Sequence, residues 1–262
     1  MWGLSIGIFL VLSACCAAYR LRWLGPSGSI AAGVLGTIVI VCGGIQWILP
    51  MLAFFIPSSF LSSIIERKKS SVSENFEKNS RRDAIQVFAN GGGGGLLALS
   101  WFYVREDPIY LMYLGGLAAV SADTWATECG ILSNTRPVLI STLQRVDSGT
   151  SGAISLAGTL GGFLGAVCVA SSGMIWLPSS GVRTGIAVVL AGMTGCVFDS
   201  ILGAIVQRRF RCTKCGRRVE KRIHCGQDTE WLGGIGWFNN DLVNLSCYLG
   251  GMLSVLAWNR MM

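Results

Sequence analysis

Apolar stretches recur along almost the whole chain, and each is long enough to cross about 30 Å of hydrocarbon as a helix. They cover residues 2–19, 28–65, 84–104, 109–131, 151–177, 184–206 and 242–258. Hydrophobic residues make up 52% of the chain and charged residues only 13%, a balance that excludes an ordinary soluble domain. The sequence therefore predicts an all-α, polytopic transmembrane helical bundle in which residues 1–262 form a single integral-membrane domain.

The stretch at 28–65 is about twice as long as one crossing requires. Gly43 and Gly44 would turn it into a helical hairpin and give eight crossings, whereas a single helix that leaves the bilayer would give seven. Residues 66–83 and 207–225 together carry 14 of the 21 lysines and arginines, so the positive-inside rule places both in the cytoplasm. Only the hairpin also places Arg20 and Arg22 there, which favours eight crossings.

The net charge of +7 follows from this bias and from attraction to anionic lipid headgroups. The expected partner is therefore the lipid bilayer, and no nucleic-acid partner is expected.

The cytoplasmic loop at 207–241 contains three of the ten cysteines; the other seven lie in or beside apolar stretches, where they serve as small apolar residues. Cys212 and Cys215 form a C-x2-C pair, which His224 and Cys225 follow. Four soft ligands on a reducing side indicate a zinc-binding knuckle, with reduced loop cysteines as the alternative. Because His224 and Cys225 are adjacent, a zinc site with three protein ligands, or with ligands from two chains, stays open.

Polar side chains recur near the ends of the apolar stretches, where a charge in hydrocarbon is costly unless it is paired, hydrated or bound to metal. They are Asn90, Asp123, Glu128, Asp199, Asn239, Asn240, Asp241 and Asn244. The predicted topology puts all of them at the cytoplasmic end. A lone membrane Asp can simply bond a neighbouring helix, but three at one face favour a functional site.

On a straight helix, Asp123 and Glu128 point about 140° apart and cannot share one ion. Either the helix unwinds between them, or Asp123 serves the site while Glu128 pairs with another group. Asn240 and Asn244 share a helix face, with Asp241 beside it, an arrangement that suits a metal or phosphate site.

The segment "LQRVDSGTSGAIS" has the features of a phosphate-binding loop. Gly149 and Gly152 bracket Thr150 and Ser151 just before an apolar helix, whose first N–H groups can face an anion, and Arg145 stands upstream. The run "GGGGG" at 91–95 lacks the Lys and Ser/Thr of a phosphate loop, and it predicts close helix packing or a flexible break beside Asn90. The basic runs at 67–69 and 81–82 are interpreted as topology signals.

Six segments resemble, in order, a known membrane family. They are "RRDAIQVFANGG", "ADTWATECGILS", "GTSGAISLAGTLGG", "FDSILGA", "CTKCGRRVEKRIHCG" and "FNNDLVN". The family is domain of unknown function 92, also known from transmembrane protein 19, and it includes a plant phytyl-phosphate kinase. A looser similarity to polyprenol kinases and CDP-diacylglycerol synthases rests on Asp123, Ala126, Gly130 and "RVDSGT", although Arg145 stands where a Lys is usual and Ser148 separates Asp147 from Gly149.

The resemblance implies an enzyme that moves a phosphoryl group from CTP or another nucleoside triphosphate to an isoprenyl-type or phytyl-type lipid monophosphate. Mg²⁺ would be held by Asp123 and Asp199, with Asp241 next. Glu128 and Arg145 complete the expected catalytic set, and Arg145 together with residues 149–152 would bind phosphate. Asn90, Asn240 and Asn244 would orient ligands.

Two other classes of protein stay open. A transporter or channel also keeps carboxylates and broken glycine-rich helices inside the membrane, but it should show related halves, and the sequence shows no convincing internal repeat. A scaffold would use the cysteine loop for partners and would not need Asp123 or Asp199.

Overall fold

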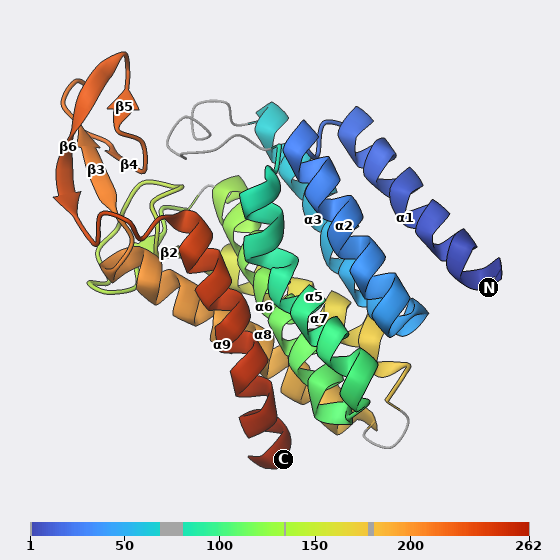
Figure 1. The fold of residues 1–262 in the computed structure, drawn as a ribbon. Helices are drawn as coiled ribbons and strands as arrows, with labels where there is room; N and C mark the ends of the chain where they lie inside the picture. The colour runs from blue at the N-terminus through green and yellow to red at the C-terminus, as the bar shows by residue number, and fades with distance from the viewer. Residues whose placement is uncertain (1, 69–80, 134, 178–180, 262) are drawn as a thin grey trace.

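The computed structural model describes residues 2–68, 81–133, 135–177 and 181–261. These residues form eight helices, which run alternately toward and away from the end shown at the top of Figure 1. Their bounds are α1 Trp2–Arg20, α2 Pro26–Gly43, α3 Ile45–Lys68, α5 Ala84–Val104, α6 Asp107–Leu132, α7 Leu156–Met174, α8 Gly181–Ile205 and α9 Asn240–Met261. The predicted helical membrane bundle is confirmed, with two small sheets added to it.

The helices differ in how strongly their composition marks them as membrane spans. In the described part of the chain, α2, α3, α7, α8 and α9 are long and apolar enough to cross a membrane. Helices α5 and α6 are also long, with 21 and 26 residues, but glycines and polar side chains dilute them. The apolar part of α1 is shorter, at Ser5–Arg20. The alternating directions of all eight helices agree with eight crossings.

The predicted break between Gly43 and the following helix is present. Helix α2 ends at Gly43, and Gly44 has a φ of 75°, a backbone conformation that glycine adopts without strain. Helix α3 begins at Ile45 and runs back beside α2 (Figure 1). The long apolar stretch is therefore a helical hairpin and not one extended helix.

Helix α6 lies at the centre of the bundle and packs against α3, α5, α7, α8 and α9. Its closest neighbour is α7, which presents a face of glycines. A Cβ atom at Gly158, Gly162 or Gly165 would lie 2.7–3.0 Å from a backbone carbonyl oxygen of α6. In lipid, where all helices are apolar, such close backbone contact is a main source of helix association.

The five glycines at 91–95 serve helix packing, as predicted. Helix α5 continues through them without a break. A Cβ atom at Gly91 or Gly95 would meet Leu35 of α2, and one at Gly93 would meet the ring of Tyr248 on α9. The run therefore lets α5 lie close to two other helices, and the flexible-break alternative is excluded.

The connection between α8 and α9 is more ordered than the predicted cytoplasmic loop. It contains the strands β3 Arg209–Cys212, β4 Arg218–Val219, β5 Ile223–His224 and β6 Gln227–Gly233, in an antiparallel sheet of order β4-β3-β6-β5. A second pair, β1 Val138–Leu139 and β2 Ala153–Ile154, lies in the connection between α6 and α7. Strands of two to seven residues are too short to show a clear alternating pattern, so the sequence did not reveal them.

The two ends of the bundle differ in their number of basic residues. Among the described basic residues, only Arg105, Arg183 and Arg260 belong to helix ends at the bottom of Figure 1. The connections that follow α1, α6 and α8 all lie at the opposite end, as does the start of α5. Residues 69–80, in the first basic segment, fall outside the described residues. We call the end that holds both sheets the polar end, and we expect it to face the cytoplasm.

This orientation predicts the labelling of two introduced cysteines by a membrane-impermeant maleimide. Glu106→Cys, between α5 and α6, should be labelled in intact cells, whereas Thr142→Cys, at the polar end, should react only after permeabilisation. Labelling is compared with that of the parent protein, which has ten native cysteines. Equal reaction of both variants in intact cells would contradict the topology, and the reverse pattern would contradict the orientation.

Candidate functional site

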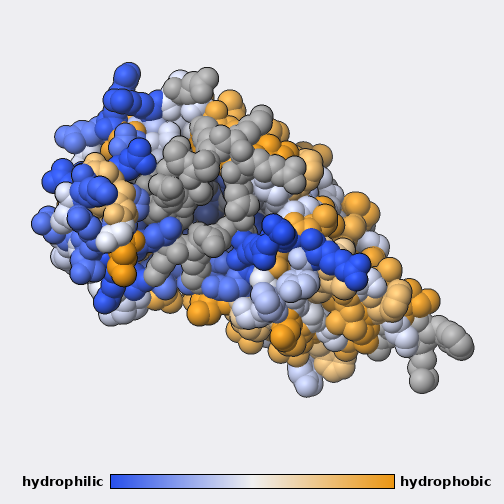
Figure 2. All heavy atoms as spheres, turned by 90° about the horizontal axis from the view of Figure 1, so that it is seen from above, coloured by the Kyte–Doolittle hydropathy of each residue, from blue (hydrophilic) through white to orange (hydrophobic). Residues whose placement is uncertain are grey.

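A cavity of about 400 Å³ opens among the helices at the polar end. Helices α3, α5, α6, α7, α8 and α9 all contribute to it, together with the loop before α7. Figure 2 looks down on this end and shows hydrophilic residues gathered on it, whereas hydrophobic residues lie along the flank of the bundle. The lining includes these residues that the sequence singled out: Asn90, Asp123, Glu128, Gly149, Thr150, Ser151, Gly152, Asp199, Asn240, Asp241 and Asn244.

Two carboxylates from different helices meet in the cavity. Asp123 of α6 and Asp199 of α8 lie within hydrogen-bonding distance of each other. The helices approach closely here because α8 has Gly192, where a Cβ atom would lie 3.0 Å from the Cβ atom of Ala118. The Oδ2 atom of Asp199 is buried and has no hydrogen-bond partner among the described residues. An uncompensated carboxylate oxygen beside a second carboxyl group is well suited to bind a cation.

The first turn of α9 brings a third acidic group and two amides to the same cavity. Asn240, Asp241 and Asn244 all line it. Asn239 caps the start of α9, because its Oδ1 atom accepts a hydrogen bond from the Leu242 N–H at 3.2 Å. Its Nδ2 atom also donates to Asp241 Oδ2 at 3.5 Å. The amide and carboxylate oxygens of this turn are hard ligands of the kind that Mg²⁺ prefers.

Glu128 lines the same cavity as Asp123 but is held there by different contacts. Helix α6 does not unwind between them; it runs unbroken from Asp107 to Leu132. Instead, the hydroxyl group of Ser62 on α3 donates to Glu128 Oε1 at 2.5 Å, and Arg82 lies close enough to interact with Glu128 electrostatically. The second of the two sequence-based alternatives, in which Glu128 pairs with other groups, therefore describes the structure.

The glycine loop before α7 forms one wall of the cavity. Gly149 and Gly152 have φ values of 83° and 77°, which L-residues with a side chain adopt only with strain. Gly152 also packs tightly on α8, where a Cβ atom would lie 2.5 Å from the backbone nitrogen of Ala204. Ser155 caps α7 by accepting a hydrogen bond from the Gly158 N–H at 3.1 Å. The loop thus holds the N-terminal end of α7 at the cavity, where Thr159 also lines it.

Arg145, predicted to bind phosphate, is not brought to the cavity by the structure. It is exposed and forms an isolated β-bridge with Val138, and it is absent from the cavity lining. The expected contact of Arg145 with phosphate therefore finds no support in the cavity lining.

Among the described basic residues, Arg82 lines the cavity. Its guanidinium group donates to Ser59 Oγ at 2.9 Å and lies over the rings of Phe54 and Phe55. Sequence reasoning interpreted this arginine as a topology signal, because basic residues beside a span usually have that role. Only its contacts with α3 and its place in the cavity lining show that it also belongs to the site.

Sequence reasoning also missed other polar residues at the site, among them Glu220 and its partner Gln207. Glu220, just after β4, lines the cavity and accepts a hydrogen bond from Gln207 Nε2 at 2.8 Å. Gln207 in turn accepts a hydrogen bond from the Ser151 hydroxyl group at 2.6 Å. Polar residues in a hydrophilic segment carry no signal of their own, so nothing in the sequence singled them out.

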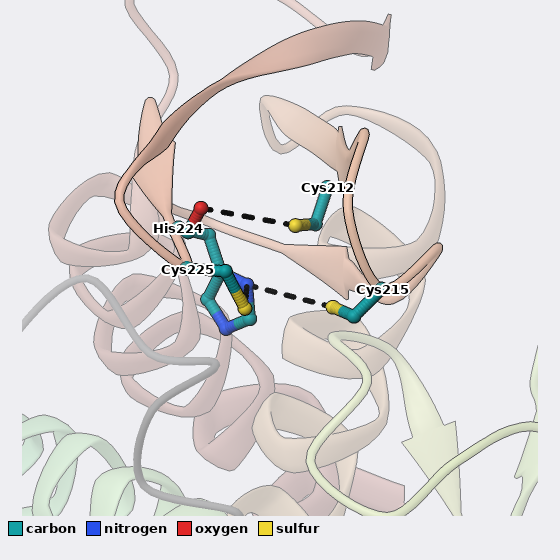
Figure 3. A group of neighbouring side chains, drawn as sticks. All are labelled: Cys212, Cys215, His224 and Cys225. Carbon is teal, nitrogen blue, oxygen red and sulfur yellow. Dashed lines mark hydrogen bonds between the residues drawn. The ribbon is translucent and has the colours of Figure 1, made fainter.

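Outside the cavity, Cys212, Cys215, His224 and Cys225 converge in the four-stranded sheet (Figure 3). Their ligand atoms all lie within 4.8 Å of one another. Hydrogen bonds from the backbone of Cys215 and from the side chain of His224 lower the pKa of the Cys212 thiol to about 6. Desolvation and the neighbouring thiols of Cys215 and Cys212 raise the pKa of Cys225. The ligand atoms of the adjacent residues His224 and Cys225 thus both reach this cluster, within one chain.

The fold and the cavity define a polytopic helical membrane protein with an acidic, glycine-flanked site at one end. The family model of "Integral membrane protein DUF92" matches residues 9–252, so the chain belongs to this integral membrane family. It is 28% identical over 257 residues to an uncharacterized membrane protein of Methanocaldococcus jannaschii, covering 97% of this chain and 94% of the relative.

Two Arabidopsis thaliana proteins are also similar to the chain. Protein PGR is 29% identical, with 92% of this chain and 91% of the relative covered. Protein VTE6, chloroplastic, is 25% identical, with 97% and 71% covered. No solved structure matches the chain.

Proposed function

We propose that the protein is a Mg²⁺-dependent phosphotransferase that moves a phosphoryl group from CTP or another nucleoside triphosphate to an isoprenyl-type or phytyl-type lipid monophosphate. The observation that carries this proposal is the gathering of Asp123, Asp199 and Asp241 in one cavity with the glycine loop and the start of α7. These three carboxylates come from three helices that are far apart in the sequence. The resemblance to a family that includes a phytyl-phosphate kinase supports the same reaction.

The donor set in the cavity fits Mg²⁺. Asp123, Asp199 and Asp241 supply carboxylate oxygens, Asn240 and Asn244 supply amide oxygens, and Asp199 Oδ2 is a buried oxygen without a hydrogen bond among the described residues. When bound, the ion would neutralise charge on the phosphates of the donor nucleotide. The ion also accounts for the grouping of carboxylates near the membrane, which would otherwise repel one another at a cost in stability.

The glycine loop and α7 supply the groups for the phosphates. The N-terminal end of a helix carries partial positive charge and free N–H groups, so an anion binds there favourably. In this structure Gly158 and Thr159 of the first turn of α7 line the cavity together with the carboxylates of α6 and α8. Their own N–H groups donate to Ser155, so this helix end contributes partial positive charge, and the backbone of the glycine loop is left to supply N–H groups. Arg82 adds a full positive charge at the cavity wall and takes the role that the sequence assigned to Arg145.

The acceptor needs no strong base. A lipid monophosphate is already an anion near neutral pH, so its oxygen can attack once it is positioned and its charge is screened. Within the described residues, the cavity lining contains no histidine, which agrees with a reaction that depends on positioning and charge neutralisation. Glu128, bonded to Ser62 and near Arg82, is placed to hold these groups in position.

An apolar strip of α8 connects the cavity with the bilayer. Val197 and Met193 lie one and two turns from Ser200 on the same face of the helix, and all three line the cavity. Val197 is 46% exposed, and we place the lateral opening of the cavity beside it. A lipid tail can therefore stay in the bilayer beside α8 while its phosphate enters among the carboxylates.

The proposed tail path predicts that Val197→Trp discriminates between acceptors. The larger ring would narrow the path, so kcat/KM for a long-chain monophosphate should fall by roughly tenfold or more, while a short-chain acceptor is affected less. Ile186→Trp is the matched control, because Ile186 lies on the same helix and is exposed but does not line the cavity. Equal losses with long and short acceptors would contradict this path.

The reaction itself is tested with purified protein, Mg²⁺, labelled nucleoside triphosphates and a panel of phytyl, geranylgeranyl and longer prenyl monophosphates. We expect Mg²⁺-dependent formation of a lipid diphosphate from at least one donor and acceptor pair. No product with any pair, combined with nucleotide-independent uptake of a solute into proteoliposomes, would favour a transporter instead.

A further inference from the structure

The four side chains Cys212, Cys215, His224 and Cys225 have the spacing of a tetrahedral metal site. Cys215 Sγ lies 3.6 Å and Cys225 Sγ lies 3.2 Å from His224 Nδ1, and all four ligand atoms fall within 4.8 Å of one another (Figure 3). Zinc with sulfur and nitrogen ligands at its usual bond lengths separates those ligands by roughly 3.5–3.8 Å. A small movement of the side chains would place all four on one ion.

We propose that these residues bind one structural zinc ion, and that this ion fixes the wall of the cavity that carries Glu220 and Ser151. Neither part depends on the proposed reaction. Any ligand of the cavity would meet the same wall.

Two turns make the ligand set possible. After Cys212, the N–H of Gly216 donates to the Cys212 carbonyl oxygen at 2.9 Å, and Gly216 has a φ of 73°, so the chain folds back and presents both thiols on one side. Cys225 and Gly226 have φ values of 54° and 74° and form the two-residue turn between β5 and β6. The left-handed conformation of Cys225 turns its thiol toward the same point as the ring of His224, although the two residues are adjacent.

The sheet is too small to be held by its apolar core. Strands β3–β6 span residues 209–233, and their buried apolar side chains are mainly Phe210, Cys212 and Val219. Units below about 40 residues generally need metals, disulfides or association for stability. All three cysteines here are free thiols, so a metal ion is the remaining internal crosslink.

The site has the features of a structural and not a catalytic zinc. It offers four protein ligands, which leaves no coordination position for a substrate or water. Cys212 is 1% exposed and His224 is 6% exposed, so two of the ligands are enclosed by the sheet. The ring of His224 already faces the thiols through Nδ1, which is the orientation that ligation requires.

A short chain of hydrogen bonds connects the metal site with the cavity. The turn that carries Cys215 leads into β4, and the Cys212 N–H donates to the Arg217 carbonyl oxygen at 2.9 Å, which holds β4 against β3. Glu220 follows β4 and accepts from Gln207 Nε2, and Gln207 Oε1 accepts from the Ser151 hydroxyl group. Gln207 is 1% exposed, so solvent does not compete for these bonds. Metal binding therefore determines where both Glu220 and the glycine loop lie.

Metal analysis tests the first part. Protein purified without chelators should contain about one zinc per chain. Cys215→Ser should lose zinc at a chelator concentration that leaves the parent protein loaded, because one of four ligands is removed. Cys16→Ser is the control, since Cys16 is an exposed thiol of α1 that is distant in sequence from the four ligands. This variant should retain the parent zinc content. Absence of zinc in the parent, or iron in its place, would overturn the assignment.

Hydrogen exchange measured by mass spectrometry tests the second part. Removing zinc should increase amide exchange both in the sheet and at residues 148–152, while α5 keeps its protection. Gln207→Met conserves side-chain volume but breaks the connection; it should keep its zinc and still show faster exchange at residues 148–152. If zinc loss accelerates exchange only within the sheet, the link between the metal site and the cavity is wrong.

Discussion

Asp123→Asn and Asp199→Asn are each expected to lower phosphoryl transfer by about two to three orders of magnitude at equal amounts of folded protein. The amide keeps the size of the carboxyl group and can still hydrogen-bond its neighbour, so the contact between α6 and α8 is preserved. What it removes is the negative charge that would bind Mg²⁺. Raising the Mg²⁺ concentration should restore part of the activity if one of the ligands is weakened and not lost.

Folding should respond very differently from activity in these two variants. Removing a charge that is costly near the membrane leaves stability unchanged or increases it. Asp107→Asn is the matched control, because Asp107 is an exposed carboxylate in the first turn of α6, at the other end of the bundle, and it should keep full activity. If both site variants are fully active at low Mg²⁺, the metal site is wrong. If their activity only follows the amount of folded protein, the two carboxylates are structural.

Gly152→Ala is expected to be the second most damaging change. The backbone of Gly152 has a φ of 77°, and a methyl group would lie 2.5 Å from the backbone nitrogen of Ala204, which cannot move without shifting α8. The glycine loop must therefore move away from α8, which displaces the neighbouring Ser151 from Gln207. Because a misplacement of about 1 Å at a positioning group can lower a rate by roughly a hundredfold, we expect a loss of that order in kcat/KM.

Backbone strain and steric displacement can be separated with a control glycine. Gly44 has a similar φ of 75°, but a Cβ atom there meets nothing within 4 Å. Gly44→Ala should thus cost about 1–3 kcal/mol of stability from strain alone, with activity per folded molecule unchanged. The comparison uses kcat/KM and the midpoint of thermal unfolding of both variants. Equal activity losses at Gly44 and Gly152 would show that the loop position is not the cause.

The placement of most site residues follows from topology alone. The distribution of basic residues indicates which loops share one side of the membrane, and this puts Asn90, Asp123, Asp199 and the Asn240–Asn244 turn at one end of the bundle. Their convergence in one cavity then needs only that α5, α6, α8 and α9 pack together. The glycine run at 91–95 and the hairpin at Gly44 were also predictable, because glycine has few other roles at such positions in membrane helices.

The remaining features depend on contacts that a single sequence does not encode visibly. Arg82 joins the site and contacts Ser59 of α3, whereas Arg145 forms a bridge with Val138 and is absent from the cavity lining. Gln207 and Glu220 became recognisable only through their bonds to Ser151 and to each other. The turn at Cys225 could not be predicted for a different reason. A left-handed conformation is uncommon for a residue other than glycine, so the adjacency of His224 and Cys225 argued against a zinc site that uses both residues.

The position of the label in the transferred group tests the central claim most directly. CTP, or whichever nucleoside triphosphate proves to be the donor, is supplied in two forms, with ³²P at the α or at the γ phosphate, together with Mg²⁺ and a prenyl monophosphate. Phosphoryl transfer predicts that the γ label appears in a lipid diphosphate, one label for each nucleoside diphosphate released, and that the α label stays in the nucleotide. Appearance of the α label in the lipid would mean nucleotidyl transfer, and the proposed reaction would be wrong even though the cavity binds both substrates.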